Sequence, residues 1–330
     1  MEGRADVRPK LRLRVDRIER LTERIKAFEL SAVDDELPRF EAGAHLDILT
    51  GNGVVRSYSL ANDPAETHRY VIAVLREPFG VGSGWIHDRV SRGDVLEVLA
   101  PQNAFALEES AAEHLLIAGG IGITPIRAMA YRLATIAARF RLLYCTRSPE
   151  DTAFNTELRE MFGERVVIHH DGGDPARSFD LKALLEDRTP GAHVYVCGPR
   201  GMIEAARQAA AHWPDDTVHY EIFASPAPDG AVTPTQAAGD VSFEVELRRS
   251  GKVITVAADQ TILDAMLAVG VRAPHVCKEG WCGNCQLILL EGRADHRDEV
   301  LSEEEKLSNT LIHTCVSRAA PGETRLVIDR

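Results

Sequence analysis

The sequence predicts a multidomain protein with three parts, and three changes of pattern along the chain indicate it. From about residue 10 to 108, short alternating apolar runs are separated by turn residues, which is typical of a small antiparallel β-barrel. From about 113 to 224, apolar strands alternate with helical stretches, which indicates βαβ units and an α/β parallel sheet. Beyond residue 240, a hairpin pattern, a helix and a cysteine-rich loop favour a small α+β domain.

These patterns predict domains at 1–110, 111–224 and 241–330, with a linker at 225–240. The linker contains three prolines and shows no hydrophobic periodicity. Such a segment either tethers the last domain with some freedom of pose or forms an ordered, docked connection.

Composition and charge limit the possible classes of function. A chain of 330 residues has room for two or three domains, and its formal net charge of −12 argues against nonspecific binding to nucleic acid or to an anionic membrane. No apolar run approaches the roughly 20 residues of a membrane span, and the N-terminus lacks an apolar signal region. Four of the six cysteines suit a metal centre, so we expect a protein of the reducing cytoplasm.

The individual elements follow from periodicity and turn residues. The barrel is expected to contain one helix near Trp85 to Val90, and its strands are expected at 11–15, 25–30, 45–49, 56–60, 70–75 and 95–99. The strands of the parallel sheet are expected at 114–118, 140–145, 166–169, 193–197 and 218–221. The helices between them are expected at 125–138, 152–161, 180–186 and 202–211. The last domain is expected to contain strands at 243–247, 253–256 and 286–289 and a helix at 261–269.

A cysteine-rich loop carries the strongest chemical signal. Cys277, Cys282 and Cys285 have the spacing Cys-x4-Cys-x2-Cys, and Cys315 follows after twenty-nine residues. This is the plant-type spacing for a [2Fe–2S] cluster. Structural zinc is the alternative, but zinc sites usually pair two Cys-x2-Cys knuckles, and the second pair is missing. A disulfide framework is disfavoured because nothing else indicates secretion.

The same loop resembles that of the plant-type ferredoxins, and the segment H-T-C-V-S-R around Cys315 is similar to their last-ligand segment. The resemblance implies a β-grasp domain whose four cysteines hold a cluster that moves one electron at a time. Gly280 and Gly283 fit such a loop, because glycine adopts positive φ and lets backbone N–H groups approach sulfur.

Arg56-Ser57-Tyr58-Ser59 resembles the R-x-Y-S motif of the ferredoxin reductase superfamily. The resemblance implies a flavin whose phosphate binds the arginine, whose ring lies on the tyrosine and whose N5 receives a hydrogen bond from the serine. An exposed arginine beside a packed tyrosine is the alternative. Gly82 and Ser83 precede a helix and suit a phosphate-binding turn, or only a turn. Here the family's arginine and first glycine are replaced by Gly80 and Val81.

A glycine-rich turn follows the first strand of the parallel sheet. Gly119-Gly120-Ile121-Gly122-Ile123-Thr124-Pro125 resembles the G-G-x-G-x-T-P turn of the same superfamily, and Cys197-Gly198-Pro199 resembles its C-G-P turn. The resemblance implies that Gly119, Gly120 and Gly122 bind a pyrophosphate and that Thr124 and Cys197 lie near the nicotinamide. The alternatives are a tight turn and a buried core cysteine. We expect Ser59, Thr124 and Cys197 to surround the reacting atoms.

Two further residues are candidates for cofactor contacts. Arg147 follows the second strand of the sheet, where the adenosine ribose is expected, so it could contact a 2′-phosphate or only the ribose and pyrophosphate. Similar reductases mostly use NADH. Phe223 ends the last strand, where the resemblance implies a flavin contact and packing in the core is an equal alternative.

In order along the chain, these motifs resemble the phthalate dioxygenase reductase family, the FMN-containing reductases of Rieske oxygenase systems, which include the vanillate demethylase and carnitine monooxygenase reductases. The C-terminal position of the cluster domain favours FMN over FAD. The resemblance implies electron flow from NADH through FMN to the [2Fe–2S] cluster and on to a partner oxygenase, in a monomer.

Alternative acceptors are a diiron oxygenase or a cytochrome, and an iron–sulfur redox sensor is the alternative of a different class. The acidic runs Asp298-Glu299 and Glu303-Glu304-Glu305 could face the partner, or could form a solvated helix face.

Overall fold

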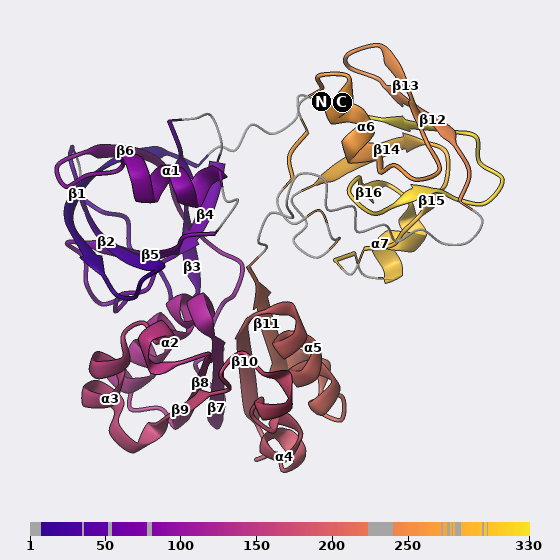
Figure 1. Ribbon diagram of the computed structural model, residues 1–330. Helices are drawn as coiled ribbons and strands as arrows, with labels where there is room; N and C mark the ends of the chain where they lie inside the picture. Colours follow the sequence, from indigo (N-terminus) through magenta and orange to yellow (C-terminus); the bar gives the residue numbers. More distant parts are fainter. Residues whose placement is uncertain are drawn as a thin grey trace. The chain divides into compact units, whose positions relative to one another are not determined.

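The computed structural model describes residues 8–34, 36–51, 55–77, 81–223, 240–271, 273–275, 278, 280, 285–298, 300–301 and 303–330. The chain divides into two compact units, Met1–Phe223 and Ala224–Arg330 (Figure 1). The first unit contains an antiparallel and a parallel sheet, and the second contains a smaller mixed sheet. The predicted linker lies outside the described residues except for its last residue, Asp240.

The antiparallel sheet contains six strands in the order β4-β3-β6-β1-β2-β5. Their bounds are β1 Lys10–Arg20, β2 Ile25–Ala32, β3 Ala44–Leu49, β4 Val55–Ser59, β5 Tyr70–Leu75 and β6 Val95–Asn103. Alternate residues along β1 to β3 are buried, as Leu13, Val15, Leu46 and Ile48 illustrate, and they fill the interior. An isolated bridge between Leu60 and Ile72 joins the chain after β4 to β5, so the sheet curls toward closure there.

All six predicted barrel strands are present, but the helix begins earlier than predicted. The helix α1 spans Val81–Arg89 and therefore includes Gly82 and Gly84. Glycine is a poor helix former, which explains why the sequence pattern placed the start only at Trp85.

The parallel sheet has the order β11-β10-β7-β8-β9. Its strands are β7 Glu113–Gly119, β8 Phe140–Thr146, β9 Val166–His170, β10 Ala192–Gly198 and β11 Val218–Ile222. The helices are α2 Ile123–Thr135, α3 Asn155–Phe162, α4 Leu181–Glu186 and α5 Arg200–Ala209. Apolar residues of α2 and α3 pack in one core cluster with the sheet, and those of α4 and α5 pack in another. The helices therefore cover opposite faces, and the α/β prediction is confirmed.

The second unit has a five-stranded sheet in the order β13-β12-β18-β14-β16 and a small two-stranded sheet of β15 and β17. The central pair, β12 Phe243–Leu247 and β18 Arg325–Ile328, is parallel. The other strands are β13 Lys252–Val256, β14 Gln286–Glu291, β15 Ala294–Asp295, β16 Leu311–His313 and β17 Arg318–Ala319. The helices are α6 Ile262–Ala268 and α7 Glu303–Ser308.

The helix predicted before the cysteine loop is α6, which begins where the sequence indicates. The Thr261 hydroxyl accepts a hydrogen bond from the backbone N–H of Asp264, so Thr261 is its N-cap. Apolar residues of α6, β12 and β18 form one core cluster, which also contains Cys285 and Cys315.

Candidate functional site

Arg56 and Tyr58 alternate along β4, so both side chains lie on one face of the strand. Arg56 is half-buried, and burial lowers the pKa of its guanidinium. Among the described residues it has no carboxylate partner, and its guanidinium donates a hydrogen bond to the carbonyl oxygen of Val55 at 2.9 Å. A half-buried cation of this kind is suited to a bound anion.

The first turn of α1 packs directly on Arg56. A Cβ added to Gly82 would lie 2.5 Å from the Cγ of Arg56, so any larger residue would displace the arginine side chain. The Ser83 hydroxyl accepts a hydrogen bond from the backbone N–H of Glu77 at 3.2 Å, which links the first turn of α1 to the chain after β5. A cation and the N-terminus of a helix therefore meet, which is the arrangement that binds phosphate.

The other residues of the β4 motif divide between two environments. Tyr58 packs against the barrel core, and burial raises the pKa of its phenol to about 12. The Ser57 hydroxyl instead donates a hydrogen bond to Asp47 on the neighbouring strand and is exposed. The structure thus brings Arg56 and Tyr58 together, but directs the side chain of Ser57 elsewhere.

The two turns predicted to bind the dinucleotide are in direct backbone contact. A Cβ at Gly122 would lie 2.2 Å from the carbonyl oxygen of Cys197, and a Cβ at Gly119 would lie 2.6 Å from Cδ of Pro199. A Cβ at Gly198 would lie 3.0 Å from the backbone of Gly119. Glycine is therefore required by close packing between the ends of β7 and β10, not only by turn geometry.

Gly120 has a φ of 54°, in the left-handed region, and its position for a Cβ faces open space among the described residues. Thr124 is 1% exposed, and its hydroxyl donates to the carbonyl oxygen of Ile121 at 3.0 Å. This bond closes the turn, so the hydroxyl of Thr124 is engaged within the protein.

Ser59, Cys197 and Glu221 come together from three strands. Ser59 ends β4, while Cys197 and Glu221 are register partners on the parallel strands β10 and β11. The Ser59 hydroxyl donates to a carboxylate oxygen of Glu221 at 3.5 Å. Ser59 is 4% exposed and Cys197 is fully buried. A hydroxyl from the barrel thus reaches a carboxyl group of the parallel sheet, and Cys197 is the register partner of that residue on the neighbouring strand.

Burial controls the protonation of this group. Burial raises the pKa of Glu221 to about 7, against a smaller opposite effect of the Ser59 hydrogen bond. Burial and the charge of Glu221 raise the pKa of the Cys197 thiol well above its usual value. Cys197 is therefore a neutral thiol, and Glu221 changes its charge near neutral pH.

The sequence analysis did not assign Glu221 as a site residue. The available signal was its position at the carboxyl end of a strand of a parallel sheet, where ligands bind.

Arg147 and Phe223 lie at the edges of this arrangement. Arg147 is exposed just beyond β8, and β10, β7 and β8 are neighbours that end at the same edge of the sheet. Cys197, Gly119 and Arg147 therefore follow one another along that edge. Phe223 is half-buried against the core cluster that contains Cys197, so packing accounts for at least one side of its ring.

In the second unit, Cys285 and Cys315 place their sulfur atoms 3.1 Å apart, and each residue is 2% exposed. This separation exceeds the roughly 2.05 Å of a disulfide bond and suits two ligands of one metal centre. Gly280 has a φ of 78°, and a Cβ there would lie 2.7 Å from Cγ2 of Val316. The donor set fits an iron–sulfur cluster. Cys277, Cys282 and Gly283 lie outside the described residues.

The expectation that Asp298 belongs to an exposed acidic face is wrong. Asp298 is 3% exposed, and it accepts hydrogen bonds from the backbone N–H groups of Val300 and Leu301. A carboxylate oxygen lies 3.2 Å from Nδ1 of His313, two residues before Cys315. Asp298 is therefore part of a buried pair with His313 and not of an exposed acidic face. Glu299 lies outside the described residues, whereas Glu303 and Glu305 are exposed on α7.

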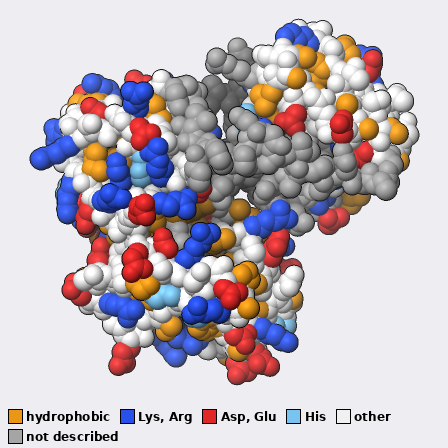
Figure 2. Space-filling view, in the orientation of Figure 1, with side chains coloured by type: hydrophobic (Ala, Val, Ile, Leu, Met, Phe, Trp, Pro, Cys, Tyr) orange, Lys and Arg blue, Asp and Glu red, His pale blue; other side chains and the backbone are white. Residues whose placement is uncertain are grey.

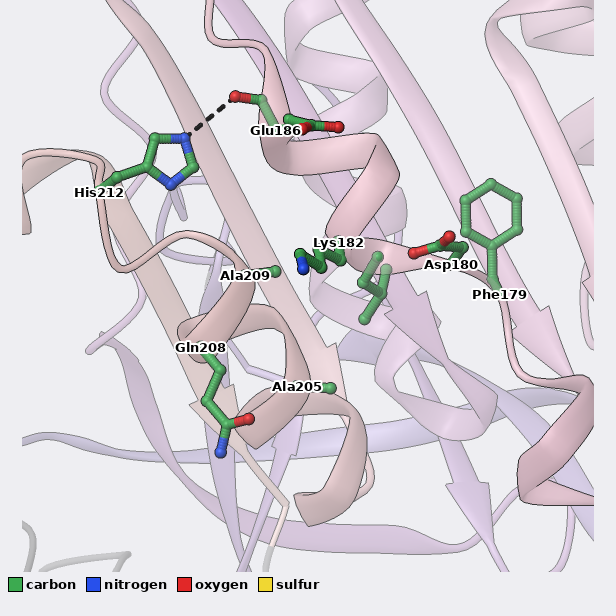
Figure 3. Close-up of a pocket in the computed structure, with 9 residues that line it drawn as sticks. Phe179, Asp180, Lys182, Glu186, Ala205, Gln208, Ala209 and His212 are labelled. Carbon is green, nitrogen blue, oxygen red and sulfur yellow. Dashed lines mark hydrogen bonds between the residues drawn. The ribbon is translucent and has the colours of Figure 1, made fainter.

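A separate pocket of about 650 Å³ lies between α4 and α5 (Figure 3). It is lined by charged and apolar side chains, including Lys182, Glu186 and His212, and His212 hydrogen-bonds to the carbonyl oxygen of Glu186 at 3.1 Å. None of the predicted site residues lines it. Positive and negative side chains are interspersed over the face of the first unit that Figure 2 shows.

The folds and the two sites define a multidomain redox protein, and comparisons with known proteins agree. Residues 100–217 match the family model of the N-terminal domain of dimethylamine monooxygenase subunit DmmA-like proteins. Residues 245–320 match the 2Fe-2S iron-sulfur cluster binding domain. In the described part of the chain, no helix combines the length and apolar character that a membrane crossing requires.

Several curated relatives match nearly the whole chain, and two of them illustrate the range. Phthalate dioxygenase reductase of Burkholderia cepacia is 43% identical over 97% of this chain and 97% of its own length. The heme-dependent oxidative N-demethylase beta subunit of Ectopseudomonas mendocina is 40% identical over 93% of this chain and 96% of its own. The solved structure of phthalate dioxygenase reductase, described as modular for electron transfer from pyridine nucleotides to [2Fe–2S], has a TM-score of 0.73 at 43% identity and covers 97% of this chain and 98% of that one.

The chain belongs to the phthalate dioxygenase reductase family. It is the reductase component of an oxygenase system, and it carries electrons from NADH through FMN to a [2Fe–2S] cluster.

Proposed function

We propose that this reductase supplies single electrons to a Rieske-type oxygenase, and that the residues around Ser59, Cys197 and Glu221 surround the hydride transfer. The observation that carries the proposal is the meeting of the R-x-Y-S strand with the C-G-P turn through Ser59 and Glu221. When bound, FMN accepts a hydride, which is two electrons and one proton, from NADH and passes the electrons singly to the cluster.

The chain's own residues have distinct tasks in this proposal. Arg56 and the first turn of α1, with Gly82 and Ser83, bind the flavin phosphate, because a half-buried cation there faces a helix N-terminus. Tyr58 supports the flavin ring. Ser59 presents a hydroxyl to its N5 edge. Phe223 covers the ring from the end of β11.

The dinucleotide lies along the carboxyl edge of the parallel sheet in this proposal. Gly119, Gly120 and Gly122 receive the pyrophosphate, since the glycines leave the backbone open. Arg147 contacts the adenosine ribose at the end of the next strand. The Cys197-Gly198-Pro199 turn holds the nicotinamide, with Thr124 fixing the facing turn.

The neutral thiol of Cys197 and the carboxyl group of Glu221 exclude water from the place of hydride transfer. Their raised pKa values keep the thiol protonated and favour the protonated carboxyl group. Hydride transfer needs no acid–base pair, so its rate depends on how the nicotinamide and the flavin are positioned relative to each other.

Cys277, Cys282, Cys285 and Cys315 are the proposed cluster ligands. Two of them have the sulfur separation of a shared metal centre in the described part of the chain. The spacing of the other two supports their assignment. Domain boundaries near residues 110 and 224, a monomeric state and a cytoplasmic location complete the proposal.

A haem enzyme is a second candidate for the electron acceptor. One specific observation favours it: a relative at 40% identity over nearly its whole length is the beta subunit of a heme-dependent oxidative N-demethylase. The same reductase architecture is therefore compatible with iron acceptors of more than one kind.

An anaerobic titration with NADH tests the electron path. We expect the flavin band at ~450 nm and the broader cluster absorbance both to bleach. A spectrum that NADH does not alter would refute the proposal. A second assay distinguishes the two acceptor classes. It compares the steady-state rates of electron delivery to a purified Rieske oxygenase and to a purified haem-dependent demethylase at equal concentrations.

A further inference from the structure

We propose that Arg127 is a positioning residue that sets the separation between the flavin strand and the dinucleotide turn, and thereby the rate of hydride transfer. The proposal rests on the proposed function, because it requires that the two elements bind the two reactants. Arg127 belongs to neither motif and contacts neither of the proposed cofactor sites.

Arg127 connects three parts of the first unit. It projects from α2 and is 7% exposed. Its Nη1 donates a hydrogen bond to the carbonyl oxygen of Ala61 in the barrel. Its Nε donates to a carboxylate oxygen of Glu157 on α3 at 2.8 Å. One guanidinium therefore fastens the barrel to two helices of the parallel-sheet domain.

Aromatic rings hold this guanidinium in place. Its central carbon lies 4.4 Å from the ring centroid of Phe154 and 5.0 Å from that of Tyr131. The Tyr131 hydroxyl donates to the same oxygen of Glu157 that Arg127 contacts. Phe154 has a φ of 58°, an unusual conformation for a bulky residue. It also packs against a cluster that contains Ile25 and Ala73 of the barrel, so the aromatic support itself spans the two domains.

The point at which Arg127 reaches the barrel is next to the reacting centre. Ala61 follows Ser59 by two residues, at the place where the barrel curls toward closure. The backbone N–H of Ala61 donates to the carbonyl oxygen of Val71 at 2.8 Å, which fixes it within the barrel. Its carbonyl oxygen is fixed from the other side by Arg127. The end of β4 is therefore clamped between the two domains.

The other end of the connection is the dinucleotide turn. The helix α2 begins at Ile123, directly after Gly122, and Arg127 lies little more than one turn along it. A helix transmits displacement rigidly over so short a distance. A shift at Arg127 therefore moves Gly122 relative to Ser59, and with it the two proposed reactants.

Burial of a charged arginine contributes little net folding stability, because its desolvation offsets the attraction of the ion pair. Glu157 is 36% exposed, so the ion pair has a buried and an open partner. Replacing a buried ion pair by apolar residues is often neutral or stabilising, whereas the pair imposes a defined geometry. The presence of an arginine at this position is therefore explained by the geometry that it imposes, and not by a gain in folding stability.

The experiment uses the full-length holoprotein with Arg127→Met and Arg127→Lys. Arg132→Met is the matched control, because Arg132 lies on the same helix but forms an exposed ion pair with Glu109. Anaerobic rapid mixing with NADH measures the rate of flavin bleaching. Titration with NAD⁺ measures the affinity for the dinucleotide. The long-wavelength charge-transfer absorbance, called the contact absorbance below, reports stacking of the nicotinamide on the flavin. Flavin and iron content, with far-UV circular dichroism, verify that each variant is loaded and folded.

We expect Arg127→Met to slow flavin bleaching about 10- to 100-fold, to weaken the contact absorbance and to leave NAD⁺ affinity within about 3-fold. Arg127→Lys should recover part of the rate, because lysine keeps the charge but cannot form the same forked contacts. Arg132→Met should match the wild type in all three measurements.

A folded, loaded Arg127→Met with the wild-type bleaching rate and contact absorbance would overturn the proposal. An equal loss of NAD⁺ affinity and rate would also overturn it, since that pattern indicates a binding defect. Should Arg127→Met not fold, Glu157→Gln decides by the same measurements, because it weakens the anchor of Arg127 and keeps its bond to Ala61. Wild-type protein that NADH does not bleach would instead refute the proposed function.

Discussion

Replacing Gly122 by alanine places a methyl group where the backbone of β10 already lies. The added Cβ would be 2.2 Å from the carbonyl oxygen and 2.5 Å from the carbonyl carbon of Cys197. Backbone cannot rotate away as a side chain can, so the turn and the strand must separate. An ordinary contact begins near 3.4 Å, so the required displacement is about 1 Å.

A displacement of about 1 Å between positioning elements costs roughly 100-fold in rate, equivalent to about 2.7 kcal/mol of transition-state stabilisation. Overpacking also costs about 1–3 kcal/mol of folding free energy. Flavin binding and cluster assembly depend on other elements, so we expect both to be unchanged. Gly122→Ala should therefore be a coloured, folded protein that NADH reduces slowly.

The assay is anaerobic rapid mixing of Gly122→Ala with NADH, followed at the flavin band. Gly201→Ala is the control, because Gly201 lies in α5 after the C-G-P turn and a Cβ there meets no atom within 4 Å among the described residues. The control should keep the wild-type rate and gain about 0.4–1 kcal/mol in stability. A folded Gly122→Ala that is reduced within 2-fold of the wild-type rate would refute the argument.

Three further changes test other parts of the site. Because burial raises the pKa of Glu221 to about 7 from 4.5, the folded protein retains a proton that the unfolded chain loses, so Tm should fall as pH rises through this interval. Glu221→Gln should flatten that dependence in calorimetric scans, and an unchanged slope would contradict the assignment. Cys315→Ser should remove the cluster absorbance and leave the flavin band, whereas Cys145→Ser should keep both. Arg56→Gln should weaken FMN binding roughly 10- to 100-fold in an equilibrium fluorescence titration, while Arg12→Gln, which breaks an exposed ion pair, should leave it unchanged.

The sequence predicted the sheets well because their signals are local. Alternation along β1 and β3 and the apolar runs of β7 and β10 depend on neighbouring residues alone. Short elements were less accessible: α7 and the strands β15 to β18 are too brief to show a period. Asp298 was misjudged because composition cannot distinguish a buried hydrogen-bonded carboxylate from a solvated one.

The site was predictable to the extent that its residues lie in motifs. The glycine turn and the C-G-P turn were identified separately, but their backbone contact depends on the packing of β7 beside β10. Glu221 carried only the signal of its position near the carboxyl end of a strand, and Arg127 carries no local signal. An arginine on a helix is most often solvated, and the partner of Arg127 is a backbone carbonyl oxygen 66 residues away in sequence.

The contact between Gly122 and residue 197 involves only backbone atoms of the latter, which every amino acid possesses. The contact itself therefore places no demand on the chemistry of the side chain at position 197, whose size is limited by the core in which it is buried. Side chains of similar size but different chemistry can therefore stand at that position without a change in the spacing of the two turns. Position 122 has no such freedom, so the two sides of one contact differ in their capacity to evolve.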